Sequence, residues 1–277
     1  GKSTSVQGML VAWFRSISGR PPATRPAIVV IDPHGDYVGR VREISDPKRF
    51  RPSLADSLEL APAVFGAGTL TCVARDLPPR ILTSAIGKLS TAQQRWADRY
   101  TLDDLDHSGL EHLLFETHEP RWPEHFADLA SDGQMSKPQI ESLRTLRARM
   151  RALLAPPLFR FDGAGTWSDF FGRLESGEVV IVDVASYPSP QQTLLMVLVA
   201  LALERRQQDA QRRGEILREV VLVADELHDF PGAFGHLNRI ALEGRKFGIA
   251  TVLGSQRVSH FPDDVLTQAT AAIVHRL

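Results

Sequence analysis

The sequence predicts an α/β fold with a mostly parallel sheet and an all-helical insertion, and three observations support this. Apolar runs rich in β-branched residues recur along the chain, as in strands buried on both faces of a parallel sheet. Segments with apolar residues at helical spacing alternate with these runs. Between them, residues 77–157 keep the helical spacing but lack such runs. The chain therefore divides into an N-terminal part of the core at 1–76, the insertion, and a C-terminal part of the core at 158–277.

The N-terminal part of the core begins with a helical pattern at about 4–18, which the Gly- and Pro-containing segment SGRPPATRP ends. The continuous apolar run AIVVID at 27–32 predicts a strand buried on both faces. Further strands are expected near 58–60 and 70–74.

The clearest helix of the insertion begins at Ser136, a favourable N-cap that Pro138 follows in the first turn. Its apolar face comprises Ile140, Leu143, Leu146, Met150 and Leu153. Pro156 and Pro157 are expected to end it, because proline cannot continue a helix.

The α/β alternation returns in the C-terminal part of the core. Strands are expected at 178–184, 219–226, 249–256 and 271–277, with helices at about 190–208 and 234–243 and a short helix after Phe261. The run LLMVLVALAL in the first of these helices has ten residues. Because a membrane-spanning helix needs about 20, this run predicts a buried helix and no membrane segment.

Charge and cysteine content restrict the function. The 32 basic residues nearly balance the 33 acidic ones, so no global basic field draws the chain to nucleic acid. Contact with DNA would have to be made by local loops or inside a ring. The single cysteine, Cys72, excludes an intramolecular disulfide and a thiolate zinc cluster. These features agree with a cytoplasmic protein.

The chain opens on GKST, Gly1 to Thr4, which is the second half of the phosphate-binding pattern G-x-x-x-x-G-K-[ST]. In a complete loop of this kind the lysine contacts phosphates and the hydroxyl contacts Mg²⁺. Without the first glycine and the strand before it, the tetrapeptide alone is weak evidence. The rest of the chain has to decide its meaning.

The segment VVLVADELHDF places Asp225 and Glu226 at the end of an apolar run, as in a Walker B strand. An acid that leaves the carboxyl edge of a parallel sheet faces the ligand crevice. There Asp225 could hold Mg²⁺, usually through water, while Glu226 polarises the attacking water. The alternative is a buried strand that merely ends in solvated acids, and this motif alone does not separate the two.

Two other predicted strands end in polar residues. Gln256, at the end of the 249–256 run, is well placed to contact a γ-phosphate or the attacking water, although a turn residue is the alternative. The segment VIDPHGDY puts Asp32, His34 and Asp36 at a strand tip, where we expect them to point into the same crevice. The structural alternative is that Asp32 caps its own turn.

The segment EGRKFG follows the helix after the Walker B strand. Arg245 could reach a phosphate bound by a neighbouring subunit, because a planar guanidinium suits developing phosphoryl charge. The alternative is charge complementarity at a helix C-terminus.

Five ordered segments, GKST, VIDPHGDY, VADELHDF, EGRKFG and SQRVS, resemble the motifs of the HerA family of the HerA/FtsK ATPases. The resemblance covers most of the chain and is loosest in the insertion. It implies a RecA-like P-loop core that assembles into a hexameric ring and hydrolyses ATP with Mg²⁺ to translocate or unwind double-stranded DNA. It also implies a partner, either a nuclease such as NurA or an effector of antiphage defence.

The resemblance assigns roles by position. Nucleotide binding falls to Gly1, Lys2, Ser3, Thr4, Asp32 and His34, Mg²⁺ binding to Ser3 and Asp225, and catalysis to Glu226, Gln256 and Arg245. In this assignment Glu226 is the base, Gln256 the sensor and Arg245 a finger that acts on a neighbouring subunit. Arg276 is a second candidate finger.

The chain also departs from the family pattern. Asp36 stands where the family usually has Glu, Leu227 where Ala is common and Val258 where Pro is common. The strand before the P-loop would lie at the centre of the sheet, so we expect these 277 residues alone to bind ATP poorly or to fold badly.

Two other functions fit the motifs. One is a conjugation or secretion motor of the same superfamily. The other is a ring-forming scaffold in which bound nucleotide assembles an effector without strong motor activity.

Overall fold

A computed structural model describes residues 12, 21, 24–35, 37, 63–67, 69–73, 93, 136–160 and 166–271 of the chain. These residues fall into two compact units, one within 1–70 and 166–277 and the other within 71–165. The larger unit carries the parallel sheet and the candidate site. None of the helices that the structure describes combines the length and the apolar character needed to cross a bilayer.

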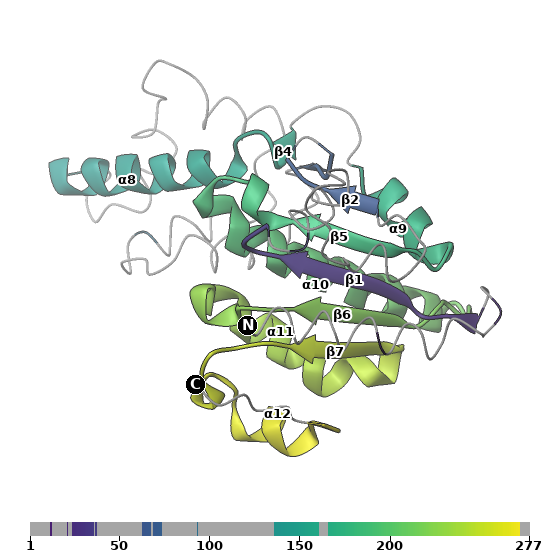
Figure 1. The fold of residues 1–277 in the computed structure, drawn as a ribbon. Coiled ribbons are helices and arrows are strands. Elements are labelled where there is room, and N and C mark those ends of the chain that lie inside the picture. Colours follow the sequence, from purple (N-terminus) through teal and green to yellow (C-terminus); the bar gives the residue numbers. More distant parts are fainter. Residues whose placement is uncertain are drawn as a thin grey trace, which may run out of the picture. The chain divides into compact units, whose positions relative to one another are not determined.

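The larger unit is built on a five-stranded sheet with the order β2-β5-β1-β6-β7 (Figure 1). The strands are β1 Ala27–Asp32, β2 Ala63–Phe65, β5 Val179–Asp183, β6 Val220–Ala224 and β7 Ile249–Leu253. Every pair of neighbours in this sheet is parallel. This confirms the predicted fold class, an α/β fold with a mostly parallel sheet.

The three central strands are buried at every position, which explains why their sequences are continuous apolar runs. The expected strand at 27–32 has the same bounds as β1. The run at 219–226 was expected to reach Glu226, but β6 ends at Ala224 because Glu226 adopts a left-handed conformation that turns the chain. The run at 249–256 likewise ends early, at Leu253.

Helices connect the strands of this unit. They are α9 Trp167–Glu175, α10 Ser189–Arg212, α11 Pro231–Glu243 and α12 Asp263–Gln268, with single-turn helices η4 Val184–Ser186, η5 Leu227–Asp229, η6 Gly244–Phe247 and η7 Val258–His260. The expected helices at 190–208 and 234–243 correspond to α10 and α11, which pack against each other on one face of the sheet (Figure 1). Residues Leu194–Ala200 of α10 are all buried, as the run LLMVLVALAL predicted.

The sequence did not predict α9 or β2. In α9 only Phe170 and Leu174 are buried, and the Phe170 ring contacts Phe65 of β2 edge-on at a centroid distance of 5.6 Å. The expected strand at 58–60 lies outside the described residues. So do the expected helix at 4–18, apart from the helical Ala12, and the expected strand at 271–277, apart from Ala271, which is not in a strand.

The smaller unit contains α8 Lys137–Leu154 and a two-stranded parallel sheet of β3 Cys72–Val73 and β4 Phe159–Arg160. The predicted helix after Ser136 is confirmed. Gln139 Oε1 accepts a hydrogen bond from the Ser136 N–H at 2.7 Å, which caps the first turn. The strand expected near 70–74 is β3. The insertion bounds of 77 and 157 stay a prediction, since many of those residues are not described.

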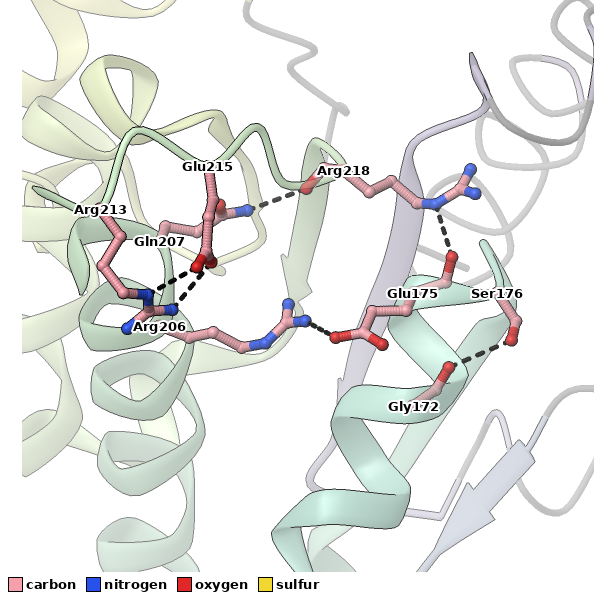
Figure 2. Close-up of polar contacts among 8 residues, drawn as sticks. All are labelled: Gly172, Glu175, Ser176, Arg206, Gln207, Arg213, Glu215 and Arg218. Carbon is pink, nitrogen blue, oxygen red and sulfur yellow. Dashed lines mark hydrogen bonds and ion pairs between the residues drawn. The ribbon is translucent and has the colours of Figure 1, made fainter. Parts of the chain in front are cut away.

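Polar contacts join α9 and α10 to the segment that leads into β6 (Figure 2). Arg218 Nε donates to the Glu175 carbonyl at 3.1 Å, and Arg206 forms an ion pair with the Glu175 carboxylate. Gln207 Nε2 donates to the Arg218 carbonyl at 2.9 Å. Arg218 also donates to the carbonyl of Arg25, two residues before β1. These contacts fix the amino-terminal edge of the sheet.

Candidate functional site

The carboxyl ends of β1, β6 and β7 meet at one edge of the sheet. Ile31 is in register with Ala224, and Ala224 is in register with Leu253. Asp32, the last residue of β1, is therefore level with Asp225 and Gly254, which directly follow β6 and β7. In a parallel sheet this edge is where ligands bind.

Asp225 is held tightly at this edge. Its side chain is 5% exposed, and Oδ1 accepts a hydrogen bond from the Glu226 N–H at 2.9 Å. The same oxygen lies against Gly254, where a Cβ atom would come within 2.1 Å of it. Sequence reasoning missed Gly254. Its position directly after an apolar run and two residues before Gln256 could have indicated a close backbone approach at the site.

Glu226 has the only positive φ of any non-glycine residue that the structure describes, with φ 51° and ψ 37°. This left-handed conformation costs about 1–2 kcal/mol for an L-residue. It turns the chain so that the Leu227 N–H donates to the Gly254 carbonyl at 3.0 Å and the Leu227 side chain is fully buried. Strain of this kind is concentrated at functional sites.

Two side chains approach the Glu226 carboxylate, which is 16% exposed. Gln256 Nε2 donates to Glu226 Oε2 at 3.4 Å, so the structure brings together the predicted base and sensor. His228 Nδ1 lies 3.1 Å from the same oxygen. Sequence reasoning did not single out His228, although a histidine two residues after the acid was visible in ELHDF.

Further polar contacts extend from His228 to two other loops. Asp229 lies between two histidines, with Oδ1 at 3.5 Å from His228 Nε2 and Oδ2 at 3.2 Å from His34 Nε2. The ring of His260 in η7 stacks on His228 at a centroid distance of 6.2 Å and an interplanar angle of 15°. His260 Nδ1 is 2.7 Å from Ser255 Oγ. Loops after β1, β6 and β7 thus meet through histidines.

Asp32 is 1% exposed, and its Oδ2 accepts a hydrogen bond from the Tyr37 N–H at 2.9 Å. This contact agrees with the structural alternative, in which Asp32 caps the turn after β1. His34 is more exposed and is tied to Asp229. A nucleotide contact by either residue stays a prediction.

Arg245 is exposed and lies in η6, directly before β7. It is therefore at the amino end of β7, whereas Gln256 follows the carboxyl end of the same strand. The structure does not bring Arg245 together with Glu226. The remaining predicted residues, Gly1, Lys2, Ser3, Thr4, Asp36 and Arg276, lie outside the described residues.

The donor chemistry of this edge fits Mg²⁺. Asp225 supplies carboxylate oxygens, the hard ligands that Mg²⁺ prefers. Mg²⁺ is usually bound by one or two carboxylates together with water and substrate phosphates. In the part of the chain that the structure describes, no three His, Cys, Asp or Glu side chains gather as a metal cluster.

The chain is similar to the DNA double-strand break repair helicase HerA of Pyrococcus furiosus, with 24% identity over 327 residues. The match covers 100% of this chain and 54% of HerA, so the chain spans about half the length of that relative. No protein-family model matches the chain. VirB4 of Thermoanaerobacter pseudethanolicus, a solved structure, aligns with a TM-score of 0.49 and 15% identity over 97% of this chain and 70% of VirB4. The match to HerA confirms the resemblance to HerA-like ATPases that the five motifs predicted.

Proposed function

We propose, from this resemblance to HerA, that the chain is the ATPase core of a ring-forming motor that translocates or unwinds double-stranded DNA. One observation carries the proposal. Glu226 follows Asp225 at the carboxyl edge of a parallel sheet, and Gln256 from the next strand approaches the Glu226 carboxylate to 3.4 Å. An acid pair with an adjacent amide can hold Mg²⁺ and orient the water that attacks a phosphoryl group.

In this proposal the carboxylate of Glu226 accepts a hydrogen bond from the attacking water and orients it toward the γ-phosphate. Gln256 contacts the same water or the γ-phosphate, and Lys2 contacts the β- and γ-phosphates. Mg²⁺, held by Asp225 and Ser3, would supply positive charge to the phosphate oxygens. Catalysis would then be mainly electrostatic, because loose phosphoryl-transfer transition states need positioning more than covalent chemistry.

In this mechanism Arg245 could contact the nucleotide only if the nucleotide were bound by a neighbouring subunit. Because it lies at the opposite edge of its own sheet, it would act on nucleotide bound by a neighbour. A hexameric ring provides such a neighbour at every site. We further propose that the ring is cytoplasmic and works with a nuclease of the NurA kind or with an effector of antiphage defence.

The proposal can be tested with Glu226→Gln in the full-length protein. We expect ATP turnover to be stimulated by linear double-stranded DNA and to fall about 100-fold or more in the variant, because removing a general base has effects of this size. Glu215→Gln, at an exposed position between α10 and β6, serves as the matched control and should keep wild-type turnover.

Wild-type, DNA-stimulated turnover by Glu226→Gln would exclude the proposed mechanism. An ATPase that DNA does not stimulate, together with nucleotide-dependent assembly of a partner, would instead support the ring-forming scaffold.

A further inference from the structure

We propose that His228 is a positioning residue that holds the carboxylate of Glu226 in its catalytic orientation. This inference rests on the function proposed above, because it gives Glu226 the role of the base. Its starting point is the 3.1 Å separation between His228 Nδ1 and Glu226 Oε2, which is shorter than the 3.4 Å contact from Gln256. His228 is therefore the nearer of these two polar neighbours of the catalytic oxygen.

Glu226 needs such a neighbour because its own backbone does little to fix its carboxylate. A glutamate side chain has three rotatable bonds, and restricting them has an entropic cost. The contact from Gln256 is longer than the usual 2.7–3.2 Å of an N–H···O hydrogen bond. A second donor on a stiffer side chain would restrict the carboxylate more closely.

The Nδ1 atom of His228 is shielded from solvent, and among the described residues it makes no aligned hydrogen bond, although it lies 3.1 Å from Glu226 Oε2. Leaving a buried polar atom in this state is unfavourable, so a small rotation that aligns it with Glu226 is favoured. Catalytic hydrogen bonds are often poorly aligned before substrate binds and tighten afterwards.

The imidazole ring of His228 is itself held from two sides. On one side, its Nε2 faces Asp229 at 3.5 Å, and Asp229 also contacts His34. On the other side its ring stacks on His260, which Ser255 Oγ and the edge-on ring of Phe234 keep in place. An imidazole with hydrogens on both nitrogens donates to both carboxylates, and one with a hydrogen on Nδ1 alone donates to Glu226. Both forms suit a positioning role.

The test compares two substitutions in the full-length protein. His228→Leu removes the nitrogen, whereas His228→Asn keeps an N–H donor two bonds from Cβ, where Nδ1 stands. We expect His228→Leu to lower the kcat of ATP hydrolysis by about 10- to 100-fold, the range for a lost hydrogen bond to a charged group. The KM for ATP should change little, and His228→Asn should recover kcat to within a few-fold of wild type.

His236→Leu is the matched control. His236 is a partly buried histidine of α11, and the structure gives it no hydrogen bond or ion pair with Glu226, His228 or Asp229. It should leave kcat unchanged. Circular dichroism and binding of a fluorescent ATP analogue would establish that each variant is folded.

Wild-type kcat in a folded His228→Leu variant would overturn the inference, as would equal losses in the Leu and Asn variants. If His228→Leu does not fold, His228→Ala takes its place: a loss of kcat in Ala that Asn recovers supports the inference, and equal kcat in the two variants overturns it. Full activity of Glu226→Gln, in contrast, would reject the proposed function itself. Loss in Glu226→Gln with no loss in His228→Leu would reject only the role of His228.

Discussion

The carboxylate of Asp225 occupies the space that a side chain at Gly254 would need, since a Cβ atom there would lie 2.1 Å from Asp225 Oδ1. Backbone hydrogen bonds fix both partners. The Gly254 N–H donates to the Ala224 carbonyl at 2.8 Å, and the Gly254 carbonyl accepts from the Leu227 N–H at 3.0 Å. Neither chain segment can therefore move aside without losing part of the strand pairing.

Gly254→Ala tests this relationship. We expect the methyl group to displace the Asp225 carboxylate, to lower the free energy of unfolding by about 1–3 kcal/mol and to reduce ATP turnover. Denaturant unfolding and ATPase assays would measure both effects. Gly235→Ala is the control, because a Cβ at this position in α11 meets nothing within 4 Å. That change should leave stability equal or slightly higher, since alanine favours helix. A Gly254→Ala protein with normal stability and turnover would show that the close approach is unimportant.

Arg218→Ala addresses the opposite edge of the sheet. The Arg218 guanidinium donates to the carbonyl of Glu175 at the end of α9 (Figure 2). It also donates to the carbonyl of Arg25, which precedes β1, and so connects α9, β1 and β6. Its removal should lower the free energy of unfolding by about 1–3 kcal/mol, because hydrogen bonds from a charged group are lost. Turnover per folded molecule should not change, since Glu226 is at the other edge.

Arg213→Ala is the matched control for this substitution. Arg213 pairs with Glu215 at the exposed end of α10, and we expect its removal to have no measurable effect on stability. Equal effects of the two arginine substitutions would contradict the structural role given to Arg218.

His236 predicts a dependence of stability on pH. Burial lowers the pKa of His236, and the positive charge of Arg239 lowers it further, while Glu204 acts in the opposite direction. Because the folded-state pKa is below the unfolded value of about 6.5, the unfolded chain binds more protons in this range. The contribution of His236 to stability is therefore present above about pH 6.5 and is lost as the pH falls through the folded-state pKa.

His236→Gln should accordingly lose part of the acid sensitivity of the wild-type protein. Urea unfolding at pH 7.5 and at pH 5.5 would give the difference in free energy of unfolding for each protein. An identical difference in both proteins would show that His236 does not contribute.

The sequence predicted the centre of the sheet well and its margins poorly, for a physical reason. Strands β1, β5 and β6 are buried on both faces, so their sequences are continuous apolar runs. At the margin, β2 has three residues, of which only Phe65 is buried, and such a short run carries no period. The helix α9 buries only two side chains and was missed for a similar reason.

In the candidate site, too, some residues could be predicted from the sequence and others could not. Asp225, Glu226 and Gln256 could be found because each follows an apolar run at the carboxyl edge. The contact of His228 with Glu226 and its stacking on His260 could not be predicted, because they depend on the left-handed turn at Glu226 and on the short helix η7. Neither conformation is encoded in hydrophobic periodicity. Arg245 was found as a motif, but its place at the opposite edge follows only from the direction of α11 and β7.

The pairing of β6 with β7 has one further consequence. Ala224 and Leu253 are in register, and the backbone hydrogen bonds of Gly254 to Ala224 and Leu227 continue the pairing past the ends of both strands. The residues that follow the two strands are therefore held at fixed positions relative to each other. A shift of β7 by one residue would move Gln256 by about 3.3 Å and reverse the faces of its side chains. The contact between Gln256 and Glu226 therefore depends on the register of β6 and β7. A single-residue deletion within β7 would separate the two side chains even if the sheet still formed.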